Sequence, residues 1–169
     1  MEEPLVNRVQ ESGLIQLDLE RELAPPKVAS VDLSAWLDGG FVLREKHFRQ
    51  EVAAWDATPY HAHVVALHCS TNAILPDWAW MLLAQKLSTV EAMAIHGTLE
   101  RAKTEAWKVA VERLDVERFR EKRLIVKGCA SAGGPGTLVA FTQKVSPIVK
   151  SLMFGEACSA VPIVKNRTS

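Results

Sequence analysis

The sequence predicts an α/β fold with a mostly parallel sheet and helices on both faces, of the three-layer doubly wound type. Strand-like and helix-like segments alternate from residue 28 to residue 164. The 169 residues are 48% hydrophobic and 24% charged, which suits one compact domain with a sizeable core. We therefore expect a single domain over residues 1–169, with residues 1–27 as an N-terminal helix and strand packed on it.

The first third of the chain predicts two strands and two helices. Apolar residues alternate with polar ones in the strand-like segments, whereas residues 41–55 have the spacing of an amphipathic surface helix. Either Asp32 or Ser34 is expected to cap a short helical turn that ends at Gly39 and Gly40. The predicted elements are a helix at residues 4–9, strands at 14–19 and 28–33, and a helix at 41–55.

The middle of the chain repeats a strand and helix order twice. Residues 63–68 are β-branched and apolar, as in a core strand. Pro76 suits the first turn of a helix over residues 77–87, and Asp77 complements its N-terminal dipole. A short strand at 92–95 follows, and Thr98 is expected to cap a helix that reaches residue 113.

The last third predicts a helical turn at 115–120, a core strand at 123–127 and a glycine-rich loop. Apolar positions then recur at helical spacing from residue 137 to residue 153, which predicts a helix bent near Pro147 and ended by Gly155. Residues 161–164 read as a final strand. The carboxyl ends of such strands are where open α/β sheets bind ligands.

Charge and composition exclude several classes of partner. Lys plus Arg number 20 and Asp plus Glu number 20, so no overall field attracts nucleic acid or an anionic membrane. The start of the chain lacks the features of a secretory signal, and no apolar stretch has membrane-spanning length. We expect a cytoplasmic protein that binds neither nucleic acid nor membrane, and homodimerisation is open.

Each of the three cysteines follows, or closely precedes, a strand-like run. Cys69 and Cys129 close such runs, and Cys158 lies just before another. If these strands are parallel neighbours, Cys69, Cys129 and Cys158 converge at one edge of the sheet, where thiolates bind zinc or an iron–sulfur cluster. His68, His96 and Glu156 are candidates for a fourth ligand. The alternative is three inert cysteines packed in the core.

The loop before the predicted helix at 137 contains three glycines that suit a binding role. Backbone N–H groups at Gly133, Gly134 and Gly136, together with the helix dipole, are expected to hold a phosphate, a carboxylate or a cluster sulfide. A plain turn is the alternative, because the spacing matches no nucleotide-binding motif. His61 and His63 suggest a metal pair or, more simply, a polar strand entrance. Neither Ser70 nor any other serine has a recognisable hydrolase motif around it.

Several short strings of the sequence carry a family resemblance. They are residues 4–9 (PLVNRV), 12–14 (SGL), 43–46 (LREK), 69–70 (CS), 73–76 (AILP) with Trp78, 126–129 (VKGC), 150–156 (KSLMFGE) and 158–159 (CS). They span nearly the whole length and include all three cysteines. On these strings the chain resembles the family catalogued as domain of unknown function 2480, which is found mainly in the Bacteroidetes. It departs from the family pattern at residues 130–136, where a more polar loop is expected, and at Asn72, where an acid is expected.

The resemblance implies no established activity. It does imply an association with the sulfur-mobilising iron–sulfur assembly system, because genes of the family often neighbour that system. The leading hypothesis is an accessory factor in iron–sulfur cluster assembly or delivery, with iron–sulfur assembly proteins as partners. Two alternatives stay open: a small-molecule enzyme that uses one reactive cysteine, Cys129 beside the glycine loop, and a protein-interaction scaffold with inert core cysteines.

Overall fold

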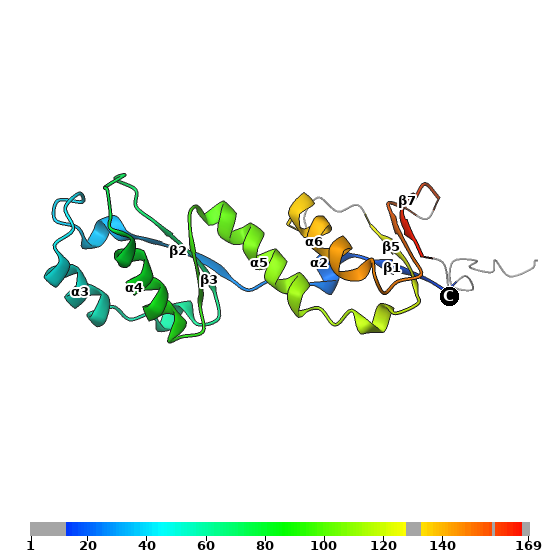
Figure 1. Cartoon of the computed structure of the whole chain (residues 1–169), viewed down its shortest axis with the longest axis horizontal. Helices are drawn as coiled ribbons and strands as arrows, with labels where there is room; N and C mark the ends of the chain where they lie inside the picture. Colours follow the sequence, from blue (N-terminus) through cyan, green and yellow to red (C-terminus); the bar gives the residue numbers. More distant parts are fainter. Residues whose placement is uncertain (1–12, 128–132, 157, 167–169) are drawn as a thin grey trace, which may run out of the picture. The chain divides into compact units, whose positions relative to one another are not determined.

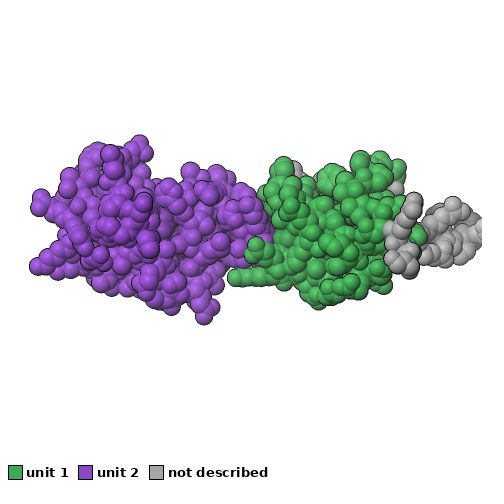
Figure 2. Space-filling model, viewed as in Figure 1, with its two compact units in different colours: residues 1–24, 110–169 green, residues 25–109 purple. Residues whose placement is uncertain are grey.

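The structure, a computed structural model, describes residues 13–127, 133–156 and 158–166. The helix predicted at residues 4–9 lies outside these residues. The chain divides into two compact units (Figure 2). Residues 25–109 form one unit, which we call the inserted unit. Residues 1–24 and 110–169 form the other, which we call the discontinuous unit because two separate stretches of sequence build it.

The inserted unit is built on a three-stranded parallel sheet in the order β2-β3-β4. The strands are β2 (Val28–Asp32), β3 (Val64–His68) and β4 (Met93–His96). The first four residues of β3 are all buried, as expected for a central parallel strand that is covered on both faces. The strands predicted at 28–33, 63–68 and 92–95 are therefore confirmed.

Helices cover both faces of this sheet (Figure 1). Val65 and Leu67 of β3 pack with residues of α3 (Glu45–Ala54) and α4 (Asp77–Ser88). Val64 and Ala66, which alternate with them, pack against Ala102 and Ala106 of α5 (Leu99–Arg113). Ala102 and Ala106 are both fully buried in this contact. The Oγ1 of Thr98 accepts the N–H of Arg101 at 3.3 Å, as the predicted cap requires.

Aromatic residues consolidate the α3 and α4 side of the inserted unit. Trp36, at the end of the 3-10 turn η1 (Leu33–Trp36), packs edge to face on Phe48 and on Trp55, with ring centroids 6.1 and 5.3 Å apart. Phe48 in turn contacts Trp78 at 5.8 Å. These indoles serve packing, as the sequence predicted.

The discontinuous unit has a four-stranded sheet in the order β1-β5-β6-β7. The first three strands are parallel, and β7 runs antiparallel to β6. Pro162 lies in β7, an edge strand, beside a register shift in β6, and edges and bulges are where a sheet tolerates proline. The strands are β1 (Leu14–Leu17), β5 (Arg123–Val126), β6 (Ser151–Phe154) and β7 (Val161–Lys165).

Helix α6 (Pro135–Val145) buries Thr137, Phe141 and Val145, which are spaced four residues apart and so lie on one face. The short helix α2 (Leu19–Glu22) begins at Asp18, whose side chain accepts the N–H of Glu20. The 3-10 turn η3 (Glu117–Phe119) matches the helical turn predicted at 115–120, and η2 (Thr58–Tyr60) precedes β3.

The α/β class and the mostly parallel strand arrangement are confirmed, with five α-helices among the described residues. The strands form two sheets, however, and the three-layer doubly wound arrangement stays a prediction. No helix in the described part of the chain combines the length and apolar character needed to cross a membrane.

Two predicted helices are wrong in extent. The helix predicted at 137–153 ends at Val145, and residues 151–154 form β6 instead. Pro147 explains the end, because its ring lacks an N–H and clashes with the preceding turn. Gly155 consequently ends a strand. The helix predicted from Phe41 begins at Glu45, because Asp38 and Val42 close a tight turn by reciprocal backbone hydrogen bonds.

Candidate functional site

The carboxyl end of the β2-β3-β4 sheet gathers polar side chains around Asp32. Its Oδ1 accepts the backbone N–H groups of Ser34 and Ser70, both at 3.0 Å. The hydroxyls of Ser34 and Ser70 lie 3.1 Å apart. Burial alone raises the pKa of Asp32, but the hydrogen bonds from Ser70 and Ser34 outweigh it and hold this pKa far below its usual range. Asp32 is thus an ionised anchor that joins two strand ends.

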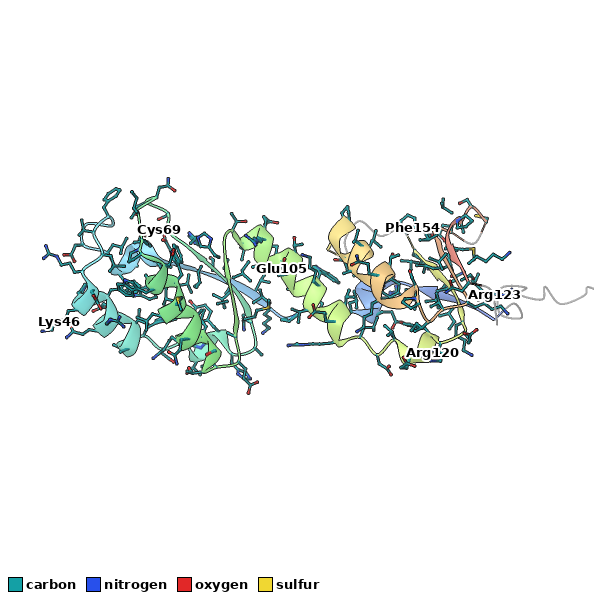
Figure 3. All side chains as sticks on the ribbon, in the orientation of Figure 1. Lys46, Cys69, Glu105, Arg120, Arg123 and Phe154 are labelled. Atoms are coloured by element: carbon teal, nitrogen blue, oxygen red, sulfur yellow. The ribbon has the colours of Figure 1, made fainter. Side chains whose placement is uncertain are left out.

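Cys69 directly follows β3 at the same edge and is half-buried (Figure 3). Its Sγ lies 3.3 Å from the Oγ1 of Thr71, and that hydroxyl donates to the carbonyl of Gly40. Because Thr71 has a single hydroxyl proton and gives it to Gly40, the thiol of Cys69 is the donor in the first contact. Cys69 therefore donates the first hydrogen bond of a short chain that runs through Thr71 to Gly40.

Gly40 makes the approach of the two loops possible. It has a φ of +80°, and a Cβ at this position would lie 3.3 Å from Cγ2 of Thr71. Glycine is the residue that adopts this backbone conformation without strain and without crowding the threonine. The contact between Gly40 and Thr71 is not evident from the sequence, where the two are 31 positions apart. The Gly39-Gly40 pair signalled a turn but not its partner.

The two histidines at this edge have different surroundings. His96 ends β4 and packs edge to face on Trp80 of α4, with ring centroids 4.6 Å apart. Cys69 also packs on the α4 side of the sheet. His68 immediately precedes Cys69 and shares the strand alternation of Ala66, which faces α5. Of the two predicted fourth ligands here, His96 therefore shares a face with Cys69.

The other two cysteines belong to the discontinuous unit. Cys158 is exposed in the short turn that joins β6 to β7, where Ser159 N–H donates to the carbonyl of Glu156 at 2.9 Å. Cys129 lies outside the described residues, three positions after the last residue of β5. The sequence hypothesis required the cysteine-bearing strands to be neighbours in one sheet. That condition is not met by the predicted strands, because β3 belongs to the other sheet and β7, which follows Cys158, does not neighbour β5 and runs antiparallel to β6. The parallel neighbour of β5 is β6, which precedes Cys158 and which the sequence predicted as part of a helix.

An exposed Cys158 corrects the idea that all three thiols are inert core residues. Among residues 13–127, 133–156 and 158–166, no group of three or more His, Cys, Asp or Glu side chains is suited to a metal ion. The three-cysteine site remains a prediction, because one of its members lies outside those ranges.

The glycine loop leads directly into α6. Gly133 and Gly134 both have a φ of 71°, and Gly134 precedes the first residue of α6, which is a proline without an N–H. The N–H of Thr137 already donates to the carbonyl of Gly134 at 3.1 Å. In the first helical turn, Gly136 is then the amide left for an anion. Binding at Gly133, Gly134 and Gly136 stays a prediction.

Thr137 of α6 is a polar residue in the buried part of this unit. Its side chain is fully buried, and its Oγ1 has no hydrogen-bond partner in the described part of the chain. Beside it, α6 and the ends of β5 and β6 enclose an apolar cavity of about 210 Å³. Seven of its eight lining residues are apolar and Thr142 is the other, so the cavity offers packing surface but little polar chemistry.

His61 and His63 are used by their own turn. Nδ1 of His61 lies 3.0 Å from the carbonyl of Val90, and Nδ1 of His63 lies 2.8 Å from the carbonyl of His61. Each ring thus has a backbone partner, as expected for a polar strand entrance. Ser70 contacts Ser34 and Asp32, and neither of these contacts is a histidine.

The profile of the family described as "Protein of unknown function (DUF2480)" matches residues 3–166. The chain belongs to this family. The match spans both units and confirms the resemblance seen in the sequence. No curated protein and no solved structure matches the chain.

Proposed function

We propose that this protein binds a metal ion or an iron–sulfur cluster through cysteine thiolates and serves in cluster assembly or delivery. Cys129 and Cys158 are the central ligands of the proposal, and Cys69 is the third. The protein would work in the reducing cytoplasm, with iron–sulfur assembly proteins as its partners.

The observation that supports the proposal is the pairing of β5 with β6. These strands are parallel neighbours, with Val126 aligned to Phe154. The chain leaves both strands at the same edge of the sheet, three residues before Cys129 and four residues before Cys158 in the sequence. Two thiolates supply half of a tetrahedral site for zinc or for a cluster iron.

Cys69 differs from the other two as a ligand. It belongs to the inserted unit, and its proton is shared with Thr71. A metal at this sulfur must displace that proton and break the hydrogen bond, because only the thiolate coordinates. The three cysteines therefore need not contribute equally.

The test is anaerobic purification, with iron, zinc and acid-labile sulfide measured on the same sample as an absorption spectrum. We expect stoichiometric iron with sulfide, or stoichiometric zinc, and loss of this metal in Cys129→Ser and Cys158→Ser. Loss in Cys69→Ser as well identifies a three-cysteine site, whereas retention limits the site to the pair. A wild-type protein that stays empty after reconstitution, or unchanged metal in all variants, overturns the proposal.

A second candidate is a small-molecule enzyme with one reactive cysteine, and the unequal environments of the thiols favour it. Cys158 is exposed, whereas Cys69 is half-buried and hydrogen-bonded. The sequence pointed to Cys129, which lies outside the described residues. Alkylation followed by intact-mass and peptide analysis ranks the three thiols. One thiol that reacts far faster than an unfolded control identifies the nucleophile, and rates at or below that control exclude this candidate.

A further inference from the structure

A cavity of about 370 Å³ lies on the β5-β6-β7 part of the sheet in the discontinuous unit. Arg123, Lys150 and Lys165 line it together with the hydroxyl-bearing Ser151. Among the described residues, Gly133, Gly134, Gly136, Cys69 and Cys158 are not part of its lining. A volume of this size matches a small organic ligand.

Strand register brings the basic residues together. Arg123 of β5 is aligned with Ser151 of β6, and Ser151 is aligned with Lys165 of β7. Aligned residues on neighbouring strands point to the same face, and their strands are about 4.8 Å apart, so the outer two Cα atoms are about 10 Å apart. Long Arg and Lys side chains can meet above the small serine between them. Arg123 stands at the start of its strand in Figure 3.

The charge of the cavity is uncompensated. Among the described residues, its lining includes three cations and no carboxylate. Within the described ranges none of the three makes an ion pair, whereas Arg118 and Arg120 of the same unit pair with Glu22 and Glu117. Because the whole chain has a formal net charge of zero, this concentration is local and not part of a general basic surface. Like charges held close without partners favour an anion between them.

The rest of the lining defines the other part of a ligand. Met153, Pro162 and Val164 present an apolar wall. Asn166 contributes no free donor, because its Nδ2 already donates to the carbonyls of Ser146 and Val149, both at 2.8 Å. The cavity thus combines positive charge with apolar surface, which suits a molecule that has an anionic group attached to an apolar body.

We propose that this cavity binds a small phosphate monoester, with the phosphate between Arg123, Lys150 and Lys165 and its organic part against Met153, Pro162 and Val164. A phosphate dianion matches three cations better than a single carboxylate does, and arginine can contact two of its oxygens at once. The hydroxyl of Ser151 is placed to donate to a third oxygen. The assignment does not depend on metal binding by the cysteines.

Phenyl phosphate is the first probe, and inorganic phosphate and phenol supply its two halves separately. Binding is followed by calorimetry and by amide chemical shifts. We expect saturable binding of phenyl phosphate with a Kd of about 1 mM or tighter, weaker binding of inorganic phosphate, and none of phenol. Binding should weaken with added salt, because the cations are partly exposed.

Arg123→Gln and Lys165→Gln test the site, and both retain a long polar side chain. Each should weaken phenyl phosphate binding about tenfold, because each removes one charge-assisted contact. Lys46→Gln on α3 is the matched control, since Lys46 is exposed and belongs to the inserted unit. Thermal melts identify any variant that fails to fold, in which case Lys150→Gln replaces it.

Two results overturn the proposal. One is the absence of saturable phenyl phosphate binding, or equal affinity in the cavity variants and in Lys46→Gln. The other is much tighter binding of a short single-stranded RNA that the same substitutions abolish, which assigns the surface to nucleic acid.

Discussion

The Oδ1 of Asp32 accepts the backbone N–H of Ser70 at 3.0 Å, which ties the end of β2 to the residue that follows Cys69. The carboxylate thereby fixes the loop on which the thiol is presented. A change at Asp32 should consequently affect both the stability of the inserted unit and the position of Cys69.

The charge of Asp32 should make stability depend on pH in the acid range. Its folded pKa is lower than the ordinary value of 3.8, so the unfolded chain takes up the proton first. The stabilisation is complete above about pH 5 and is lost as the pH falls below about 4. Urea denaturation at several pH values measures the free energy of unfolding of wild type and of Asp32→Asn. In the acid range this free energy should depend less on pH in the variant than in wild type.

Asp32→Ala provides the comparison. Asparagine retains an oxygen that caps η1. At neutral pH we therefore expect the free energy of unfolding to fall by about 1 kcal/mol in Asp32→Asn and by about 2 kcal/mol in Asp32→Ala. If the free energy of unfolding depends on pH equally in all three proteins in the acid range, Asp32 is not an ionised anchor.

Thr71→Val should increase the reactivity of Cys69. The substitution keeps the shape of the side chain but removes the hydroxyl that contacts Sγ and Gly40. Loss of about 1 kcal/mol of hydrogen bonding corresponds to about fivefold faster labelling of Cys69 through local opening. Cys158 in the same variant is the internal control, and its labelling rate should not change. A Cys69 rate equal to that of wild type would refute the role given to Thr71.

Lys144 caps the carboxyl end of α5. Its Nζ donates to the carbonyls of Val111, Glu112 and Leu114 at 2.9, 2.5 and 2.8 Å. The ammonium donates to carbonyls at the end of the helix, although that of Val111 also accepts the N–H of Leu114 at 3.2 Å, and it complements the negative end of the dipole. Lys144→Met should lower the free energy of unfolding by about 1 to 3 kcal/mol in urea titrations.

Lys103→Met is the matched control for Lys144→Met. Lys103 contacts Glu100 one turn away on the exposed surface of α5. Loss of this contact should lower the free energy of unfolding by less than about 0.5 kcal/mol. Comparable losses in the two variants would show that the three carbonyl contacts contribute little.

Gly134→Ala should destabilise the discontinuous unit through the backbone alone. Gly134 has a φ of 71° and a ψ of −163°, and a Cβ there meets no atom within 4 Å. This conformation is essentially restricted to glycine, so alanine should cost about 1 to 3 kcal/mol. Gly136→Ala lies inside α6 and should change stability by less than about 1 kcal/mol. A Tm for Gly134→Ala equal to that of Gly136→Ala would remove the strain argument.

Local sequence patterns predicted most elements because each depends on neighbours in the chain. The alternation in residues 28–33 and the Asp32 cap depend on a few adjacent side chains, and both are present. Residues 148–152 show where such patterns mislead. Val149 and Leu152 are apolar at a spacing that suits a continued helix, yet Leu152 lies in a strand. Pro147 was the better indicator here, because proline ends a helix even where the apolar spacing continues.

The division into two sheets was beyond local patterns. β1 pairs with β5, more than a hundred residues later in the sequence, and the sequence of residues 14–17 does not predict that pairing. For the same reason, the candidate ligand cavity could not be predicted from the sequence. Arg123 and Lys165 are distant in sequence, and strand register brings them to one face, where Lys150 joins them in lining the cavity. Equal totals of acidic and basic residues concealed their grouping.

The pairing of β1 with β5 also sets an order for folding during synthesis. Residues 25–109 are contiguous and leave the ribosome with all three strands of their sheet, so the inserted unit can fold while translation continues. β1 emerges earlier but must wait until residue 126 is made before its partner exists. The nascent chain thus exposes an unpaired apolar strand for most of its elongation, and this segment is where a chaperone would be needed.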